Sequence, residues 1–171
     1  LTTTNGQLNF GYPDSVRNIT VNLGGNFTLT QGGNNTQIAP VILFNGAGNQ
    51  TITNTGGTIF AQSTWTINKS SGSATLASAI VHPSTITVAE GILDVAGNTL
   101  TTATSLTLQD GATLKLQGGE TSLTTPTLGV GSTTVMYTGS GSYSGLKAGN
   151  SYHNLTFNGL GTWTMNAALD V

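Results

Sequence analysis

The feature that most constrains how this chain can fold is an internal repeat of 20–21 residues. Four tetrapeptides share an alternation of hydroxyl and apolar side chains, which is the pattern of a strand with one buried face. They begin at Thr64, Thr85, Ser105 and Thr125, in steps of 21, 20 and 20 residues. A second series of alternating segments begins at Leu93, Leu114 and Val135, in steps of 21 residues. Each period therefore holds at least two short strands.

A period of this length with short strands and glycine turns is typical of one coil of a β-solenoid. A single coil cannot bury its own inner face, so successive coils stack strand on strand. We therefore predict an all-β fold, a single-stranded parallel β-helix of about seven coils with three short strands each. Turns are expected at Glu90-Gly91, Asp110-Gly111 and Val130-Gly131.

Matching positions in the repeat predict rows of side chains along the stack. Trp65, Ile86, Leu106 and Pro126 are expected to form one inward row. Because proline cannot donate a ladder hydrogen bond, Pro126 predicts a bulge or the edge of a coil. Residues 18–171 are assigned to the solenoid. Residues 1–17 show no clear coil and are expected to form an N-terminal cap or a linker.

The composition agrees with an all-β chain and excludes several kinds of partner. Thr, Ser, Asn and Gly make up 86 of the 171 residues, and four basic and six acidic residues carry all the charge. Such a chain favours strands and turns over helices. Its basic residues lie far apart, which argues against nucleic acid, and no apolar run approaches the ~20 residues needed for membrane insertion. The lack of cysteine excludes disulfides and thiolate metal sites.

Two acidic residues are the strongest candidates for catalysis. Glu90 and Asp110 occupy the same expected turn in adjacent coils, which would place them about 5 Å apart. Retaining glycosidases use carboxyl groups at such a separation, so a polysaccharide-degrading enzyme is one alternative. Acidic-glycine dipeptides are also ordinary turn residues. We expect no catalysis, and no Ca²⁺ site because two carboxylates fall short of its usual 6–8 oxygen ligands. Asp94 and Lys115 are expected to form a surface ion pair.

The remaining polar motifs predict neither a cofactor nor a metal. His82, which precedes Pro83, and His153 have no histidine, cysteine or aspartate at ligand spacing and are expected in or beside turns. Gly46-Ala47-Gly48 and Gly139-Ser140-Gly141 lead into no helical pattern, so we interpret them as turns and not as phosphate-binding loops. Six Asn-x-Ser/Thr sequons permit glycosylation without indicating it.

An outward row of hydroxyl side chains is the most suggestive surface feature. The candidate surface ladder consists of Thr64, Thr66, Thr85, Thr87, Ser105, Thr107, Thr125 and Thr127. Regular Thr-x-Thr rows on a flat β-helix resemble those of ice-binding proteins, so an ice-binding β-solenoid is an alternative function. Threonine is also common at exposed strand positions and stacks well with itself. Trp65 and Trp163 are expected to face the core instead of forming a sugar platform.

Three segments resemble the repeat units of large bacterial surface proteins. They are residues 106–114 (LTLQDGATL), 135–141 (VMYTGSG) and 152–157 (YHNLTF). The resemblance is to filamentous-haemagglutinin-like and autotransporter-passenger-like β-helical adhesins, and it carries over no functional residue. It implies a right-handed β-helix that is extracellular, either on the cell surface or secreted. The expected function is a structural or adhesive module, with surface glycans as candidate ligands.

A longer repeat bears on assembly. Residues 18–29 match residues 154–165 without gaps at an offset of 136, and residues 42–48 resemble residues 135–141. Segments 162–165 and 168–171 are expected to be strands, and no amphipathic helix that could cap an end is apparent. We expect a processed chain or part of a longer one that associates head-to-tail, as a homopolymer or within a tandem array. A net charge of only −2 offers little repulsion against this.

Overall fold

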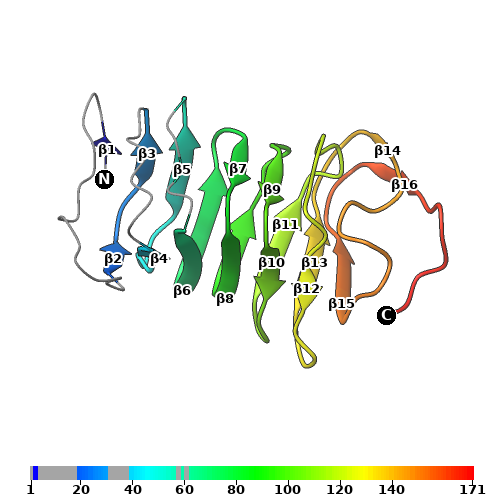
Figure 1. The fold of residues 1–171 in the computed structure, drawn as a ribbon. Helices are drawn as coiled ribbons and strands as arrows, with labels where there is room; N and C mark the ends of the chain where they lie inside the picture. Colours follow the sequence, from blue (N-terminus) through cyan, green and yellow to red (C-terminus); the bar gives the residue numbers. More distant parts are fainter. Residues whose placement is uncertain (1, 4–18, 31–38, 57–58, 60–61) are drawn as a thin grey trace.

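The computed structural model describes residues 2–3, 19–30, 39–56, 59 and 62–171 as short strands stacked along one axis (Figure 1). Every strand pairing is parallel. No helix occurs among the described residues, and the stack makes about six turns. The predicted all-β solenoid is therefore confirmed.

Two continuous columns of strands run along the stack. Column A consists of β2 (Thr20–Leu23), β4 (Val41–Phe44), the first part of β6 (Thr64–Leu76), the first part of β8 (Thr85–Asp94), β10 (Ser105–Leu108) and β12 (Thr127–Leu128). Column B consists of β1 (Thr2–Thr3), β3 (Phe27–Leu29), β5 (Gln50–Asn54), the second parts of β6 and β8, β11 (Thr113–Leu116), β13 (Thr134–Tyr137) and β15 (Asn154–Phe157). Column A ends at β12, whereas column B continues to β15.

Among the described residues, the third side of the coil has four short strands. β7 (Ile80–His82) pairs with β9 (Leu100–Thr102), and β14 (Ser142–Ser144) pairs with β16 (Thr162–Thr164). Leu100 also forms an isolated bridge to Leu123. Each of these strands follows a column B strand and has only three residues. The stack makes about six turns, so the prediction of about seven coils was slightly too high. The segments that follow β1, β3 and β5 lie mostly outside the described residues.

The core consists of the inward-facing rows of the two columns. Trp65, Ile86 and Leu106 of column A are buried in one row, and Leu93 and Leu114 face them from column B. These side chains belong to a single hydrophobic cluster. Burying each one stabilises the fold by roughly 1.5–3 kcal/mol. Alternation along each strand thus places the apolar half of the repeat inside.

Pro126 occupies the edge of column A. It is buried, and β12 begins at the next residue and pairs only with β10. Its missing N–H therefore breaks no ladder on the outer side, as predicted for a coil edge.

The corner between columns A and B differs from one coil to the next. β6 and β8 pass through it as bent strands, with Gly72 and Gly91 at φ of 70° and 83°. A Cβ on Gly91 would lie 2.6 Å from the Lys69 carbonyl oxygen, so only glycine fits there. The expected turn at Glu90-Gly91 is thus a bend inside a strand. At Asp110-Gly111 the chain does turn between β10 and β11.

The long repeat does not bring equivalent strands to the same column. Thr20, on β2, pairs with Val41 in column A, whereas its repeat counterpart Thr156, on β15, pairs with Met136 in column B. The offset of 136 residues is therefore not a whole number of coils. Segment 168–171 forms only one bridge, between Ser151 and Asp170, so the strand predicted there is absent.

Candidate functional site

The predicted hydroxyl ladder lies on the outer face of column A. Thr66 pairs with Thr87, Thr87 with Thr107, and Thr107 with Thr127. The other four members lie two residues earlier along the chain. Thr64, Thr85 and Ser105 begin their strands, whereas Thr125 lies two residues before β12 and outside it. Neighbouring strands are ~4.8 Å apart and alternate residues ~6.6 Å apart. The ladder is therefore two residues wide over three adjacent coils, and Thr127 extends one row of it onto a fourth.

The ladder contains a hydrogen bond between neighbouring coils and ends beside an apolar strand on its N-terminal side. The Ser105 hydroxyl donates to Thr85 Oγ1 at 3.4 Å, which links two coils. On the N-terminal side the same outward positions are Val41 and Leu43 of β4. The ladder thus presents hydroxyl and methyl groups together and ends against an apolar strand.

The outer face of column B is chemically mixed. Lys115 Nζ lies 2.8 Å from Asp94 Oδ2 across two coils, which confirms the predicted ion pair. Ile92 and Met136 occupy other outward positions of this column. The outer positions of a coil therefore accept charged, apolar and hydroxyl side chains alike.

The two acidic residues at the A–B corner have different surroundings. The Asp110 carboxylate accepts a hydrogen bond from the Gly131 N–H at 2.8 Å, and a Cβ on Gly131 would come within 2.5 Å of it. Asp110 thus caps the turn of the following coil. Glu90 is exposed on the strand position paired with Asn68.

Lys69 is a buried cation that we did not predict. Its side chain is only 1% exposed, and Nζ donates to the carbonyl oxygen of Gly46, to that of Gly48 at 2.8 Å and to Gln50 Oε1 at 2.8 Å. Gln50 Nε2 in turn donates to the Leu23 carbonyl at 2.8 Å. Burial lowers the pKa of Lys69. Three coils are joined through this one corner.

Glu120 is a buried acidic residue whose hydrogen-bond partners are backbone N–H groups. Its carboxylate accepts hydrogen bonds from the N–H groups of Gln117 at 2.6 Å and Gly118 at 2.9 Å. It also lies near the buried Tyr137, whose pKa is raised by burial and to a smaller extent by this carboxylate. The Tyr137 hydroxyl accepts a hydrogen bond from the Ala148 N–H at 3.1 Å. Glu120 therefore closes the turn that follows β11.

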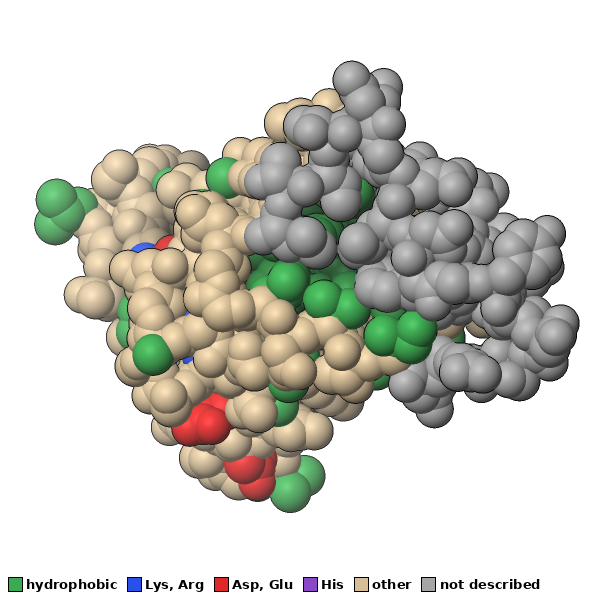
Figure 2. Space-filling view, turned by 90° about the vertical axis from the view of Figure 1, so that its left-hand side faces the viewer, with side chains coloured by type: hydrophobic (Ala, Val, Ile, Leu, Met, Phe, Trp, Pro, Cys, Tyr) green, Lys and Arg blue, Asp and Glu red, His purple; other side chains and the backbone are tan. Residues whose placement is uncertain are grey.

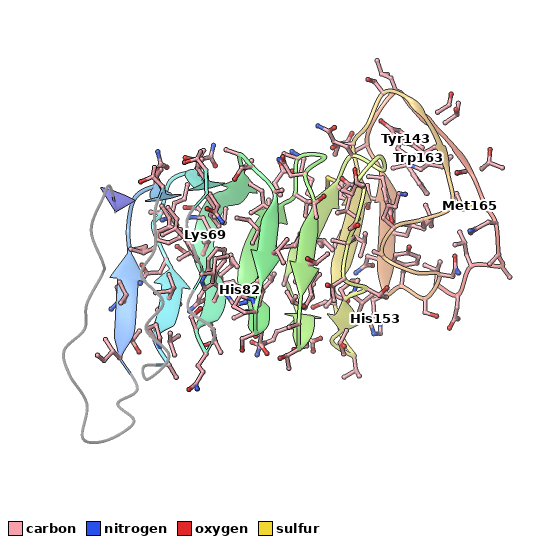
Figure 3. All side chains as sticks on the ribbon, turned by 45° about the horizontal axis from the view of Figure 1, so that its top comes forward. Lys69, His82, Tyr143, His153, Trp163 and Met165 are labelled. Atoms are coloured by element: carbon pink, nitrogen blue, oxygen red, sulfur yellow. The ribbon has the colours of Figure 1, made fainter. Side chains whose placement is uncertain are left out.

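His82 faces the interior, although we expected it in a turn. It is the last residue of β7 (labelled in Figure 3). Its ring packs edge-on against Trp65, with the ring centroids 4.7 Å apart. Nδ1 accepts a hydrogen bond from the Ser84 N–H, and Nε2 has no partner among the described residues. Burial lowers the pKa of His82 to about 4, against a smaller opposing effect of that hydrogen bond. His82 lies two residues after the buried Ile80 on the same strand, so its ring points to the same inner face.

His153 lies at the other end of the molecule, beside a shallow cavity. The cavity has a volume of about 480 Å³, and Ser151, Tyr152 and Asp170 also line it. Ser151 and Asp170 meet there through a backbone bridge. Among the described residues, no three His, Asp or Glu side chains gather in a position to hold a metal ion.

The two tryptophans have different environments. Trp65 is buried in an edge-to-face cluster with Phe27 and Phe44, as expected for the core. Trp163 is half-buried and stacks on Tyr143, with centroids 5.3 Å apart (Figure 3). This pair sits in the last coils, where no further coil covers it among the described residues.

Comparison with models of protein families, with curated protein sequences and with solved structures finds no match. The likeness to β-helical adhesins is therefore a resemblance of the sequence, and the structure supports its β-solenoid fold. No helix long and apolar enough to cross a membrane occurs in the described part of the chain. Figure 2 shows the N-terminal end of the molecule, where few charged side chains are visible among the residues coloured by type.

Proposed function

We propose that this chain is a non-catalytic structural module of an extracellular, repetitive protein, and that it stacks head-to-tail on further copies. The observation that carries this proposal is the course of column B. Its first strand β1 pairs only with β3 and its last strand β15 only with β13 among the described residues. Within the described residues, both ends of one parallel column thus have a strand edge without a partner, and such edges template further pairing.

The chemistry of the C-terminal end supports stacking. Phe157 is 42% exposed and Leu160 94% exposed, and Met165 adds a third exposed apolar side chain. Asp170 is the one formally charged residue in the last 24 positions, from Ala148 onward. An apolar end with little charge favours burial against a like surface.

The charged residues support a scaffold role. Lys69, Asp94, Asp110, Lys115 and Glu120 all contact another coil or close a turn of their own. Half of the ten charged residues therefore hold the solenoid together. Catalysis would need titratable groups that converge on a substrate instead.

Association is tested by light scattering on the chain over a range of concentrations. We expect mass to rise with concentration, and the double substitution Phe157→Asp and Leu160→Asp to abolish the rise. Val130→Asp is the matched control, because Val130 is 89% exposed in the loop between β12 and β13. A wild-type chain that stays monomeric throughout would contradict the proposal. Polysaccharide turnover that Glu90→Gln or Asp110→Asn abolishes would contradict its non-catalytic part.

Water ordering or ice binding by the column A ladder is a second candidate function. It is favoured by the contrast between the two outer faces: because column B accepts Asp94, Lys115 and Met136, the fold does not require the uniform hydroxyl row of column A. Thermal hysteresis is the test. Loss of activity in Thr87→Tyr and Thr107→Tyr, with retention in the column B variant Thr113→Tyr, would support it. No activity in the concentrated wild-type chain would reject it.

A further inference from the structure

The tripeptide Phe-Asn-Gly occurs twice, at residues 44–46 and 157–159, and each time it spans the end of a column strand. In both copies the glycine packs against a coil below. A Cβ on Gly46 or on Gly159 would lie 2.2 Å from the carbonyl oxygen of a glycine in the preceding coil. Glycine is therefore needed at both sites for close packing. The chain thus keeps an Asn-Gly dipeptide in two matched positions.

In the first copy, hydrogen bonds hold both reactive groups of the dipeptide. Asn45 Nδ2 donates to Asn22 Oδ1 at 3.2 Å, and the Asn45 N–H donates to the Leu23 carbonyl. The Gly46 N–H donates to the buried Gln50 Oε1 at 3.1 Å. Coils lie on both sides of this copy, and Phe44 is fully buried. The Asn45 side chain is exposed, but a hydrogen bond holds its amide, and the glycine nitrogen is bonded to a buried acceptor.

In the second copy these groups are open. The Asn158 side chain is exposed, and only its backbone N–H is held, by the Tyr137 carbonyl at 2.8 Å. Within the described part of the chain, neither the Asn158 amide nor the Gly159 N–H has a hydrogen-bond partner. The glycine lacks a side chain that would hinder approach to the amide carbon.

We infer that Asn158-Gly159 is a site of spontaneous deamidation, and that Asn45-Gly46 is protected from it. The Gly159 nitrogen loses its proton to water and attacks Asn158 Cγ. A Cγ–N bond forms, the Cγ–Nδ2 bond breaks, and Nδ2 leaves as ammonia with a proton from solvent. Water then opens the five-membered succinimide at either carbonyl. The products are aspartate and isoaspartate, each with one new carboxylate.

The consequence for assembly rests on the proposed stacking. Asn158 directly follows β15, on the edge where a further coil would pair. A carboxylate there adds charge to an apolar end, and isoaspartate also lengthens the backbone by one methylene, which breaks the strand register. Deamidation should therefore weaken association. Conversely, a stacked copy should protect Asn158 as the coils around Asn45 protect it.

The test is peptide mass spectrometry of the full chain, diluted and incubated in mildly alkaline buffer. We expect conversion of Asn158 to aspartate and isoaspartate while Asn45 stays intact, and conversion of both in denaturant. Asn158→Gln should remove the modification. Equal conversion of the two sites in the folded chain, or none at Asn158, would overturn the inference whatever the state of association.

Light scattering on Asn158→Asp separates this inference from the proposed function. We expect its association to be weaker than that of Asn158→Gln. If deamidation occurs and the wild-type chain never associates, the stacking proposal fails and the modification site stands. If the chain associates and Asn158 stays intact in the dilute monomer, the modification site fails and stacking stands.

Discussion

Columns A and B pass through the same coils and share the long strands β6 and β8, yet they differ on the outside. Their inner rows are alike, with apolar side chains buried at every other position. Outside, column A repeats hydroxyl groups over four coils, whereas column B mixes the Asp94–Lys115 ion pair with Ile92 and Met136. The inner row therefore determines the fold, and the outer row is left free for function.

The largest effect should come from the inner rows. Leu106→Ala in column A and Leu114→Ala in column B should each lower the free energy of unfolding by about 2–5 kcal/mol, because each opens a cavity in a fully buried position. Thr107→Ala and Lys115→Ala, one position further along the same strands, should change it by less than about 1 kcal/mol. Urea denaturation checks both pairs. Similar losses for inner and outer variants would contradict the division.

Lys69 tests whether a buried charged side chain contributes to the stability of the fold. Lys69→Met should cost about 3 kcal/mol, because it removes the donor to the buried Gly46 carbonyl and to the Gly48 carbonyl and leaves Gln50 Oε1 with the Gly46 N–H alone. Lys115→Met, which removes a lysine from the outer face of column B, should cost less than about 1 kcal/mol. Thermal unfolding of the two variants side by side gives the comparison. Equal costs would show that the buried network adds no stability.

His82 is a buried titratable group on the third side of the coil, so it should make the stability of the fold depend on pH. Burial holds its folded pKa near 4, below the unfolded value of 6.5, so only the unfolded chain gains a proton in that interval. Stability should therefore be full above pH 6.5 and fall by about 3 kcal/mol as the pH drops to 4. The free energy of unfolding, measured against pH, checks this. His82→Phe should flatten this part of the profile, and the exposed-site variant His153→Gln should not.

The smallest effect concerns the ion pair on column B. A double-mutant cycle on Asp94→Asn and Lys115→Met should give a coupling energy of about 0.2–1 kcal/mol, because water screens this half-exposed pair. The coupling should shrink in high salt. A coupling well above this range would mean that the outer row contributes to folding as strongly as the inner one.

Much of the fold could be predicted because stacking turns sequence period into spatial register. The steps between Thr66, Thr87 and Thr107 in the sequence are the steps between adjacent strands in the structure. On the third side, the strand predicted at 162–165 is confirmed by β16. The positions of β7, β9 and β14 were not predicted, because three residues are too few to show alternation. The same alternation that placed Trp65 inside also places Lys69 there, four residues later.

Other residues carried a weaker signal. Glu120 lies in an irregular turn, and nothing in the spacing of its neighbours predicts a buried carboxylate. Pro83 suggested a turn at His82, yet β7 ends only at that residue and keeps its ring inside. The hydroxyl ladder was visible in the sequence, because all of its members except Thr125 are outer residues of regular strands. What the ladder binds stays a prediction.

Disulfide cross-linking between copies tests the central claim, that column B continues from one copy into the next. Following the Cα partners along the column, Asn158 stands at the level of Thr2. Paired strands lie ~4.8 Å apart, within the Cα separation that a disulfide spans. The chain has no cysteine of its own, so Thr2→Cys and Asn158→Cys chains can be mixed under mild oxidation. We predict disulfide-linked dimers that join the unlike chains. Cross-linking no greater than with a Val130→Cys chain, or only between like Asn158→Cys chains, would contradict head-to-tail stacking.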